Sequence, residues 1–101
     1  MAKKFKIEYY PIAVEDHYSI GEYIKKDNPI AVIEMIDKIE GSIRRLESFP
    51  EIGAIPKDIR LKQTGYRMLI IGDYLAFYVI EKETVKVRRI LHGSRAYSFL
   101  L

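Results

Sequence analysis

The sequence predicts one α+β domain over residues 1–101, with one strand and two helices ahead of an antiparallel sheet of three strands (β-α-α-β-β-β). The chain has the length of a single domain and is 49% apolar. Its apolar residues recur at helical spacing in the first half. In the second half they form short runs separated by turn residues. The helices should form an antiparallel hairpin that packs its apolar stripes on one face of the sheet.

Residues 4–10 predict the first strand, because Phe5, Ile7 and Tyr9 alternate with charged residues. Pro11 ends this strand and can open a helix. Residues 12–26 predict that helix, with one face formed by Ala13, His17, Ile20 and Ile24.

The second helix should begin at Asn28 and Pro29, a capping residue followed by a residue suited to the first turn. Its apolar stripe alternates between spacings of four and three, which is typical of a helix that packs on one side. The stripe consists of Val32, Ile36, Ile39, Ile43 and Leu46, with Met35 beside it. Phe49 and Pro50 end the helix.

Residues 50–65 are predicted to be a loop, because the turn-forming residues Gly53, Pro56 and Gly65 follow Pro50 in this segment. Three strands follow at residues 66–71, 74–80 and 85–92. The short turns at Gly72-Asp73 and Lys82-Glu83 make them antiparallel neighbours. The pattern does not place the first strand in this sheet, and the face away from the helices is expected to be functional or exposed to water.

The composition excludes several kinds of chemistry. With no cysteine and two histidines, the sequence offers neither disulfides nor thiolate catalysis, and we expect no metal and no cofactor. The first residues lack the apolar run of a signal peptide, and no stretch is long enough to span a membrane. We therefore expect a cytoplasmic protein.

The net charge of +3 is unevenly distributed. Residues 1–56 carry eight basic and ten acidic residues, whereas residues 57–101 carry nine basic and four acidic ones. Such asymmetry is typical of proteins with an anionic partner, either nucleic acid or an acidic protein, although a solvated charged surface explains it as well.

Several segments resemble a known family. The run from Gly65 to Arg67, the run from Leu75 to Ile80 and the run Val85-Lys86-Val87-Arg88-Arg89-Ile90-Leu91-His92-Gly93-Ser94-Arg95 resemble the C-terminal half of RelE/ParE-type toxins of bacterial toxin–antitoxin modules. Residues 13–24 and Phe49-Pro50-Glu51-Ile52-Gly53 resemble the family's first helix and the loop after its second. The resemblance covers almost the whole chain.

The resemblance implies a growth-inhibiting toxin, of the plasmid-stabilisation type, that a small acidic antitoxin neutralises, with a heterotetramer as one possible assembly. ParE-type members inhibit DNA gyrase, whereas RelE-type members cleave messenger RNA on the ribosome. A family member that only binds its antitoxin is a third alternative. Because one fold serves both activities, the site must decide between them.

RNA cleavage needs cationic groups for the phosphorane charge and groups that move protons. If the protein is a nuclease, the candidate catalytic residues are Arg67, His92, Arg95 and Tyr97. The candidate target-binding residues are Lys57, Arg60, Lys62, Tyr74 and Arg88. RelE-type nucleases usually carry arginine at the position of Tyr74, so the sequence favours the ParE-type reading.

Alternation along the last strand separates its two arginines. Arg89 should share a side with Val85, Val87 and Leu91, whereas Arg88 should share the other side with Ile90 and His92. We therefore interpret Arg89 as structural, with its guanidinium bonded to carbonyls or a carboxylate, and Arg88 as the surface contact. His17, on the apolar stripe of the first helix, is interpreted as a hydrogen-bonded core or interface residue.

Overall fold

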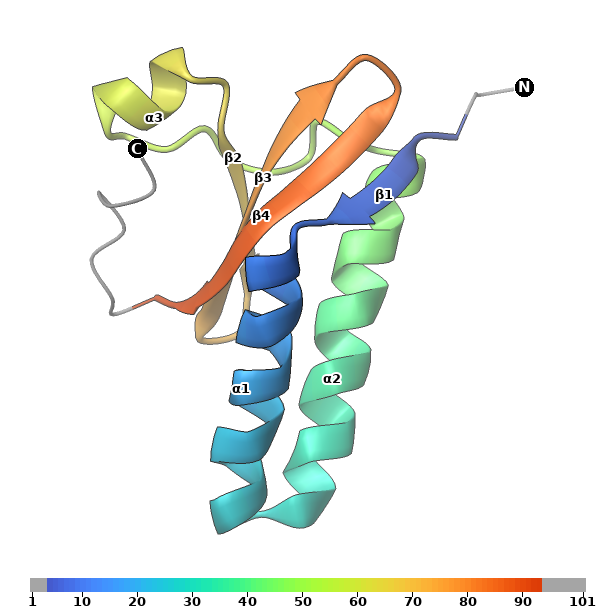
Figure 1. The fold of residues 1–101 in the computed structure, drawn as a ribbon, viewed down its shortest axis with the longest axis vertical. Coiled ribbons are helices and arrows are strands. Elements are labelled where there is room, and N and C mark those ends of the chain that lie inside the picture. The colour runs from blue at the N-terminus through green and yellow to red at the C-terminus, as the bar shows by residue number, and fades with distance from the viewer. Residues whose placement is uncertain (1–3, 94–101) are drawn as a thin grey trace.

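The computed structural model describes residues 4–93, with the side chain of Asp27 left out. A four-stranded sheet packs one face against a long helical hairpin, and the hairpin extends well beyond the sheet (Figure 1). The elements are β1 (Lys6–Tyr9), α1 (Pro11–Asp27), α2 (Pro29–Arg44), the 3₁₀ turn η1 (Arg45–Glu47), α3 (Ile59–Gln63), β2 (Arg67–Ile71), β3 (Tyr74–Glu81) and β4 (Thr84–His92). No helix in the described part of the chain is long and apolar enough to cross a membrane.

The strand order is β1-β4-β3-β2. The three C-terminal strands form the predicted antiparallel meander, and its turns contain Gly72 (φ 60°) and Lys82 (φ 57°). The sequence did not place β1, which pairs in parallel with β4, from Lys6 opposite Thr84 to Tyr9 opposite Val87. The sheet is therefore mixed, with β1 at one edge and β2 at the other.

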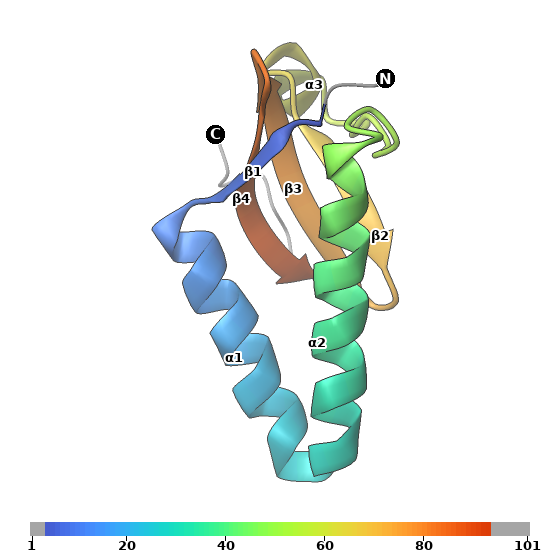
Figure 2. The ribbon, with the colours of Figure 1, turned by 90° about the vertical axis from the view of Figure 1, so that its right-hand side faces the viewer.

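The tight turn of the hairpin is built by Asn28, as predicted. Its Oδ1 accepts hydrogen bonds from the N–H groups of Ile30 (3.1 Å) and Ala31 (3.3 Å), and Pro29 occupies the first helical position. The predicted stripe of α2 faces the core, where Ile39, Ile43 and Leu46 are buried. Figure 2 shows α1 and α2 side by side, with the sheet behind their upper halves.

A main core fills the space between the hairpin and the sheet. It joins Ala13 and Ile20 of α1 and the buried residues of α2 to alternate residues of the strands. Those strand residues are Leu69, Ile71, Tyr74, Ala76, Tyr78, Val85, Val87 and Ile90.

The opposite face of the sheet, which was expected to be functional or exposed to water, carries a second apolar cluster and is buried in part. Its buried members are Leu61, Tyr66, Phe77 and Leu91. Leu61 comes from α3, a five-residue helix within the segment predicted to be a loop. Asp58 starts that helix, because its Oδ1 accepts the N–H groups of Arg60 (2.9 Å) and Leu61 (3.4 Å).

The predicted alternation of β4 is wrong beyond Val87. Tyr78 pairs with Val87 and Phe77 pairs with Arg89, so Arg88 is the extra residue of a β-bulge. The bulge shifts the alternation by one residue. Ile90 therefore joins the main core, and Leu91 joins the second cluster.

Candidate functional site

Arg88 lies between two aromatic rings. Its Cζ is 4.3 Å from the centroid of the Tyr10 ring, at the junction of β1 and α1, and 5.7 Å from that of Tyr66. Tyr66 in turn packs edge-on against Phe77, with centroids 6.5 Å apart and an angle of 80° between rings. The bulge thus places the guanidinium of Arg88 against two tyrosine rings, an arrangement stabilised by cation–π attraction. We call Tyr10, Tyr66 and Arg88 the Arg88 cluster.

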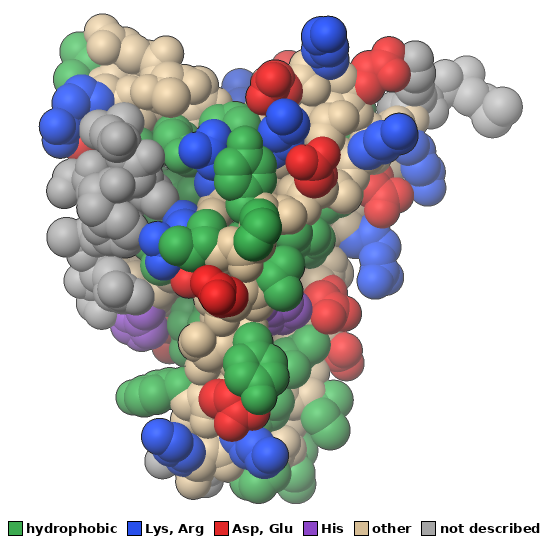
Figure 3. All heavy atoms as spheres, viewed as in Figure 1, with side chains coloured by type: hydrophobic (Ala, Val, Ile, Leu, Met, Phe, Trp, Pro, Cys, Tyr) green, Lys and Arg blue, Asp and Glu red, His purple; other side chains and the backbone are tan. Residues whose placement is uncertain are grey.

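Other predicted target-binding cations lie on α3 and the loop before it. Lys57, Arg60 and Lys62 are exposed. Arg60 is 3.7 Å from Asp58, with 62% of its side chain exposed, so this ion pair leaves its guanidinium available to solvent. Hydrogen bonds from the backbone of Arg60 and Leu61, together with the Arg60 charge, hold the pKa of Asp58 below its usual value. Figure 3 shows Lys and Arg side chains over the sheet and α3, beside hydrophobic ones and with acidic side chains between them.

Lys86, two residues before Arg88, pairs with a carboxylate. Its Nζ lies 3.2 Å from Glu81 Oε2 across the β3–β4 turn. The hydrogen bond to Glu81 raises the pKa of Lys86 above its ordinary value.

The guanidinium of Arg67 is occupied by the loop after α2. Its Nη1 donates to the carbonyl oxygens of Glu51 and Gly53, each at 3.0 Å. These bonds fix the loop on the outer side of β2. Arg67 is a candidate catalytic residue of the nuclease reading, but in this structure its Nη1 group binds backbone carbonyls.

Arg89 binds a carboxylate of α1, as its interpretation as a structural residue predicted. Its Nε and Nη2 donate to Asp16 Oδ2 (2.7 Å) and Oδ1 (3.0 Å), and the N–H of Ile90 also donates to Asp16 Oδ2 (3.1 Å). Both side chains are largely buried, and the bond to Asp16 raises the pKa of Arg89. Asp16 thus fastens α1 to the part of β4 that β1 does not cover.

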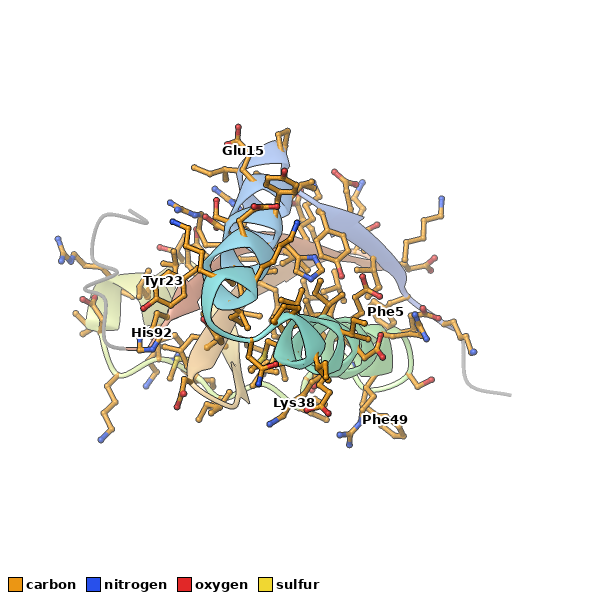
Figure 4. The ribbon with its side chains drawn as sticks, turned by 90° about the horizontal axis from the view of Figure 1, so that it is seen from below. Phe5, Glu15, Tyr23, Lys38, Phe49 and His92 are labelled. Atoms are coloured by element: carbon orange, nitrogen blue, oxygen red, sulfur yellow. The ribbon has the colours of Figure 1, made fainter. Side chains whose placement is uncertain are left out.

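His92 packs on Tyr74 at the end of β4. The two ring centroids are 5.4 Å apart, with an angle of 83° between the rings. Tyr74 is only 8% exposed, and its burial, with Tyr23 and Asp73 nearby, raises the pKa of its hydroxyl. Figure 4 shows Tyr23 of α1 and His92 on the same side of the molecule.

The described members of the proposed nuclease set are not gathered around one point. Arg67 pairs with Tyr78 and His92 pairs with Tyr74, so they lie four residues apart along β3, about 13 Å. Arg95 and Tyr97 lie outside the described residues. Among residues 4–93, no group of three or more His, Cys, Asp or Glu side chains is placed to hold a metal ion.

Sequence reasoning missed Tyr10 as a partner of Arg88. Tyr10 directly precedes Pro11, and its ring meets Arg88 only because β1 pairs with β4. Neither local pattern nor residue spacing predicts that pairing. The sequence indicated only that Tyr10 is an aromatic residue at the end of a strand.

The fold and this site define a small toxin domain of the RelE/ParE type. The sequence profile described as the ParE toxin of the type II toxin–antitoxin system parDE matches residues 7–97. The chain therefore belongs to the ParE toxin family.

Solved structures agree with this assignment at the level of the fold. The chromosomal ParDE system of P. aeruginosa is similar with a TM-score of 0.74 and 16% identity, over 88% of this chain and 96% of that one. The RelBE2 toxin–antitoxin complex of Mycobacterium tuberculosis gives 0.58 and 20%, over 88% and 98%. A conserved hypothetical protein of Helicobacter pylori gives 0.58 and 14%, over 92% and 99%. A search of curated proteins found no significant match.

Proposed function

We propose that this protein is the toxin of a type II toxin–antitoxin module and that it inhibits growth by binding DNA gyrase rather than by cleaving RNA. Its partner in the cell is a small acidic antitoxin, which neutralises it in the cytoplasm. Two of the similar structures are described as toxin–antitoxin systems or complexes, which supports the antitoxin.

The contacts and position of Arg67 are the main support for gyrase binding rather than RNA cleavage. A nuclease must aim a cation at the scissile phosphate and place a proton-transfer group within hydrogen-bond reach. Arg67 instead donates to two loop carbonyls and lies far along β3 from His92. Tyr74, at the position where RelE-type nucleases carry arginine, is buried against the helices.

The Arg88 cluster supports a function in binding. A guanidinium held against two tyrosine rings is preorganised, so less side-chain entropy is lost when it meets an anionic group of a target. The exposed cations of α3 extend the positive charge on this side of the sheet. Arg88 is therefore the residue from which we expect the largest loss of target binding on substitution.

The test combines two readouts on the same purified toxin. We expect excess toxin to abolish supercoiling by purified gyrase and to leave a defined message intact on translating ribosomes. Arg88→Ala should weaken gyrase inhibition by about tenfold or more, because it removes a charged hydrogen bond or ion pair to the target. Arg45→Ala, an exposed arginine at the end of α2, is the matched control and should inhibit like the wild type.

Two outcomes would overturn this proposal. Message cleavage with unaffected gyrase would establish the nuclease alternative. Normal growth on induction, in cells lacking the antitoxin, would show a family member that only binds its antitoxin.

A further inference from the structure

A pocket of about 550 Å³ lies between α1, the start of β3 and the end of β4. Its size falls within the range of pockets that hold ligands. Three buried apolar side chains line it, those of Ile20, Ile90 and Leu91. The residues of α1 that line this pocket differ from those that line the groove between α1 and α2. The pocket is therefore separate from the space between the two helices.

The hydroxyl of Tyr74 opens into this pocket without a hydrogen-bond partner. Tyr74 is only 8% exposed, and its hydroxyl makes no hydrogen bond within residues 4–93. Its pKa is raised first by burial and then by Tyr23 and Asp73, two residues that also line the pocket. In the described part of the chain, only His17 has a side-chain atom, Nε2, that is both unpartnered and sealed from solvent, contrary to its interpretation as a hydrogen-bonded residue. The Tyr74 oxygen is therefore open to solvent, and the pocket is where a partner can reach it.

Asp73 carries the unbalanced charge of the pocket. Its carboxylate makes no ion pair with any residue that the structure describes. The other carboxylate, that of Asp16, is already bonded to Arg89, so this pair adds little net charge. On the α2 side, Lys38 approaches Gly72, where its Nζ would lie 3.4 Å from an added Cβ, but it forms no ion pair with Asp73. No lysine or arginine among the described residues lines the pocket, which therefore attracts a cation.

The remaining groups of the pocket suit a cation that is carried on an apolar stem. The ring of Tyr23, 68% exposed, offers a face that attracts cations, and the Ser19 hydroxyl can accept a hydrogen bond. The charged neighbours of Tyr23 along α1, Glu22 and Lys26, have opposite signs and largely cancel each other. The apolar lining accommodates methylene groups. The pocket thus combines what arginine and lysine side chains and aliphatic amines need.

We propose that this pocket binds a guanidinium or ammonium group on an aliphatic stem. The cation pairs with Asp73 and donates a hydrogen bond to the Tyr74 hydroxyl, and the stem packs on the apolar lining. The two sources of such a group are a basic side chain of the protein target and a free polyamine. In the first case, the target presents an anion to Arg88 and a cation to the residues around His92, roughly 13 Å further along β4. Only that assignment rests on the proposed function.

Butylguanidinium tests the chemistry, with butylurea as its uncharged isostere. In two-dimensional NMR at about pH 8, where an ordinary histidine is neutral, butylguanidinium chloride should saturably shift the backbone amides of Ser19, Asp73 and Tyr74. A ligand this small should have a dissociation constant of about 1–10 mM. Butylurea should bind at least about fivefold more weakly, because it cannot form the ion pair. Equal binding of the two ligands would overturn the proposal, as would shifts confined to exposed carboxylates outside the pocket.

Two variants test the polar groups separately. Asp73→Asn, at a turn position that asparagine also suits, should weaken butylguanidinium binding by about fivefold or more. Asp37→Asn, exposed on α2 and outside the pocket, changes the net charge equally and should change binding by less than about twofold. Tyr74→Phe should weaken binding by about threefold or more and leave thermal unfolding unchanged, because its hydroxyl has no partner to lose. A purely structural role would lower stability instead, and unchanged binding in both Asp73→Asn and Tyr74→Phe would contradict the proposal.

Gyrase and spermidine separate the two sources. If a basic side chain of gyrase occupies the pocket, Asp73→Asn should inhibit supercoiling at least about fivefold more weakly than Asp37→Asn. If a polyamine occupies it, spermidine should bind the wild type at least about tenfold more tightly than butylguanidinium, and gyrase inhibition should not depend on Asp73. If neither holds, butylguanidinium is an adventitious additive only, and the proposal fails. A wild-type protein that does not inhibit gyrase contradicts the proposed function alone, because the titrations do not use gyrase.

Discussion

The hydroxyl of Tyr78 fixes the loop after α2 from inside the protein. It accepts a hydrogen bond from the N–H of Gly53 (2.9 Å) and donates one to the carbonyl of Pro50 (2.7 Å). Arg67 holds the same loop from outside, through the carbonyls of Glu51 and Gly53. Tyr78 and Arg67 together hold the backbone of the Phe49-Pro50-Glu51-Ile52-Gly53 segment on the sheet.

Gly53 should therefore tolerate no side chain. A Cβ at this position would lie 2.5 Å from the Tyr78 hydroxyl oxygen, so Gly53→Ala must displace the ring or the loop and break both bonds. We expect the free energy of unfolding to fall by about 2–3 kcal/mol, the usual cost of overpacking and of losing buried hydrogen bonds. Urea unfolding monitored by circular dichroism measures it.

Gly41 provides the matched control. It lies within α2, and a Cβ there would meet nothing within 4 Å. Gly41→Ala should raise stability by roughly 0.5–1 kcal/mol, because alanine loses less entropy in a helix. Equal effects of the two substitutions would contradict the role assigned to the Tyr78 hydroxyl.

At the scale of elements, one side chain joins the helical hairpin to the end of β4. β1 ends at Tyr9, so the edge of β4 beyond Val87 would expose its backbone. Asp16 covers this edge, since its carboxylate accepts from the N–H of Ile90 and from two guanidinium nitrogens of Arg89. The position of α1 thus depends on a largely buried ion pair.

Asp16→Ala should be among the most destabilising changes at a polar residue. It removes the carboxylate that accepts from two guanidinium nitrogens of Arg89 and from the N–H of Ile90, in a place where the Asp16 and Arg89 side chains are only 12–16% exposed. We expect a loss of about 3 kcal/mol, typical of breaking one side of a buried pair. Thermal unfolding gives the value.

Arg60→Ala breaks the exposed pair with Asp58 and serves for comparison. Exposed ion pairs contribute little, so the loss should stay below about 1 kcal/mol. If Asp16→Ala costs no more than this, another contact must hold α1 on the sheet.

Local signals predicted the elements better than their pairing. Asn28-Pro29 and the α2 stripe predicted the hairpin, because capping and periodicity depend on neighbouring residues. The parallel pairing of β1 and the bulge at Arg88 arise from contacts between distant segments and could not be predicted this way. α3 was missed because five residues with one buried side chain leave too weak a period.

For the candidate site too, the sequence predicted the kinds of residue but not their contacts with distant parts of the chain. Carbonyls or a carboxylate were predicted as the partner of Arg89, and the structure shows a carboxylate, but its source, Asp16, is 73 positions away in the sequence. The sequence could not show that loop carbonyls occupy Arg67, since a basic residue on a strand is equally compatible with binding phosphate. Side-chain type alone therefore predicted the candidates, and the fold separated the structural arginines from Arg88.

At the scale of the molecule, both faces of the sheet are apolar, and tyrosines supply much of that apolar surface. Tyr74 and Tyr78 lie in the main core, Tyr9 packs against it, and Tyr66 belongs to the second cluster. Burial raises the pKa of Tyr9, Tyr74 and Tyr78 above the ordinary value of 10.0. The fold therefore favours the protonated form of these phenols more than the unfolded chain does.

This shift makes the stability of the whole domain depend on alkaline pH. Between the unfolded and folded pKa values, the folded state binds more protons than the unfolded state, so stability falls as pH rises. The contribution of the three tyrosines is complete below about pH 10, the pKa of an unfolded tyrosine, and is lost progressively above it.

Tyr78→Phe should be less stable at pH 8 by about 1–2 kcal/mol, since Gly53 N–H and Pro50 C=O lose their partner. It should also lose less stability than the wild type between pH 9 and 11, because one titrating phenol is gone. Urea unfolding at constant ionic strength across this range measures both, and identical pH slopes for the two proteins would contradict the role of Tyr78.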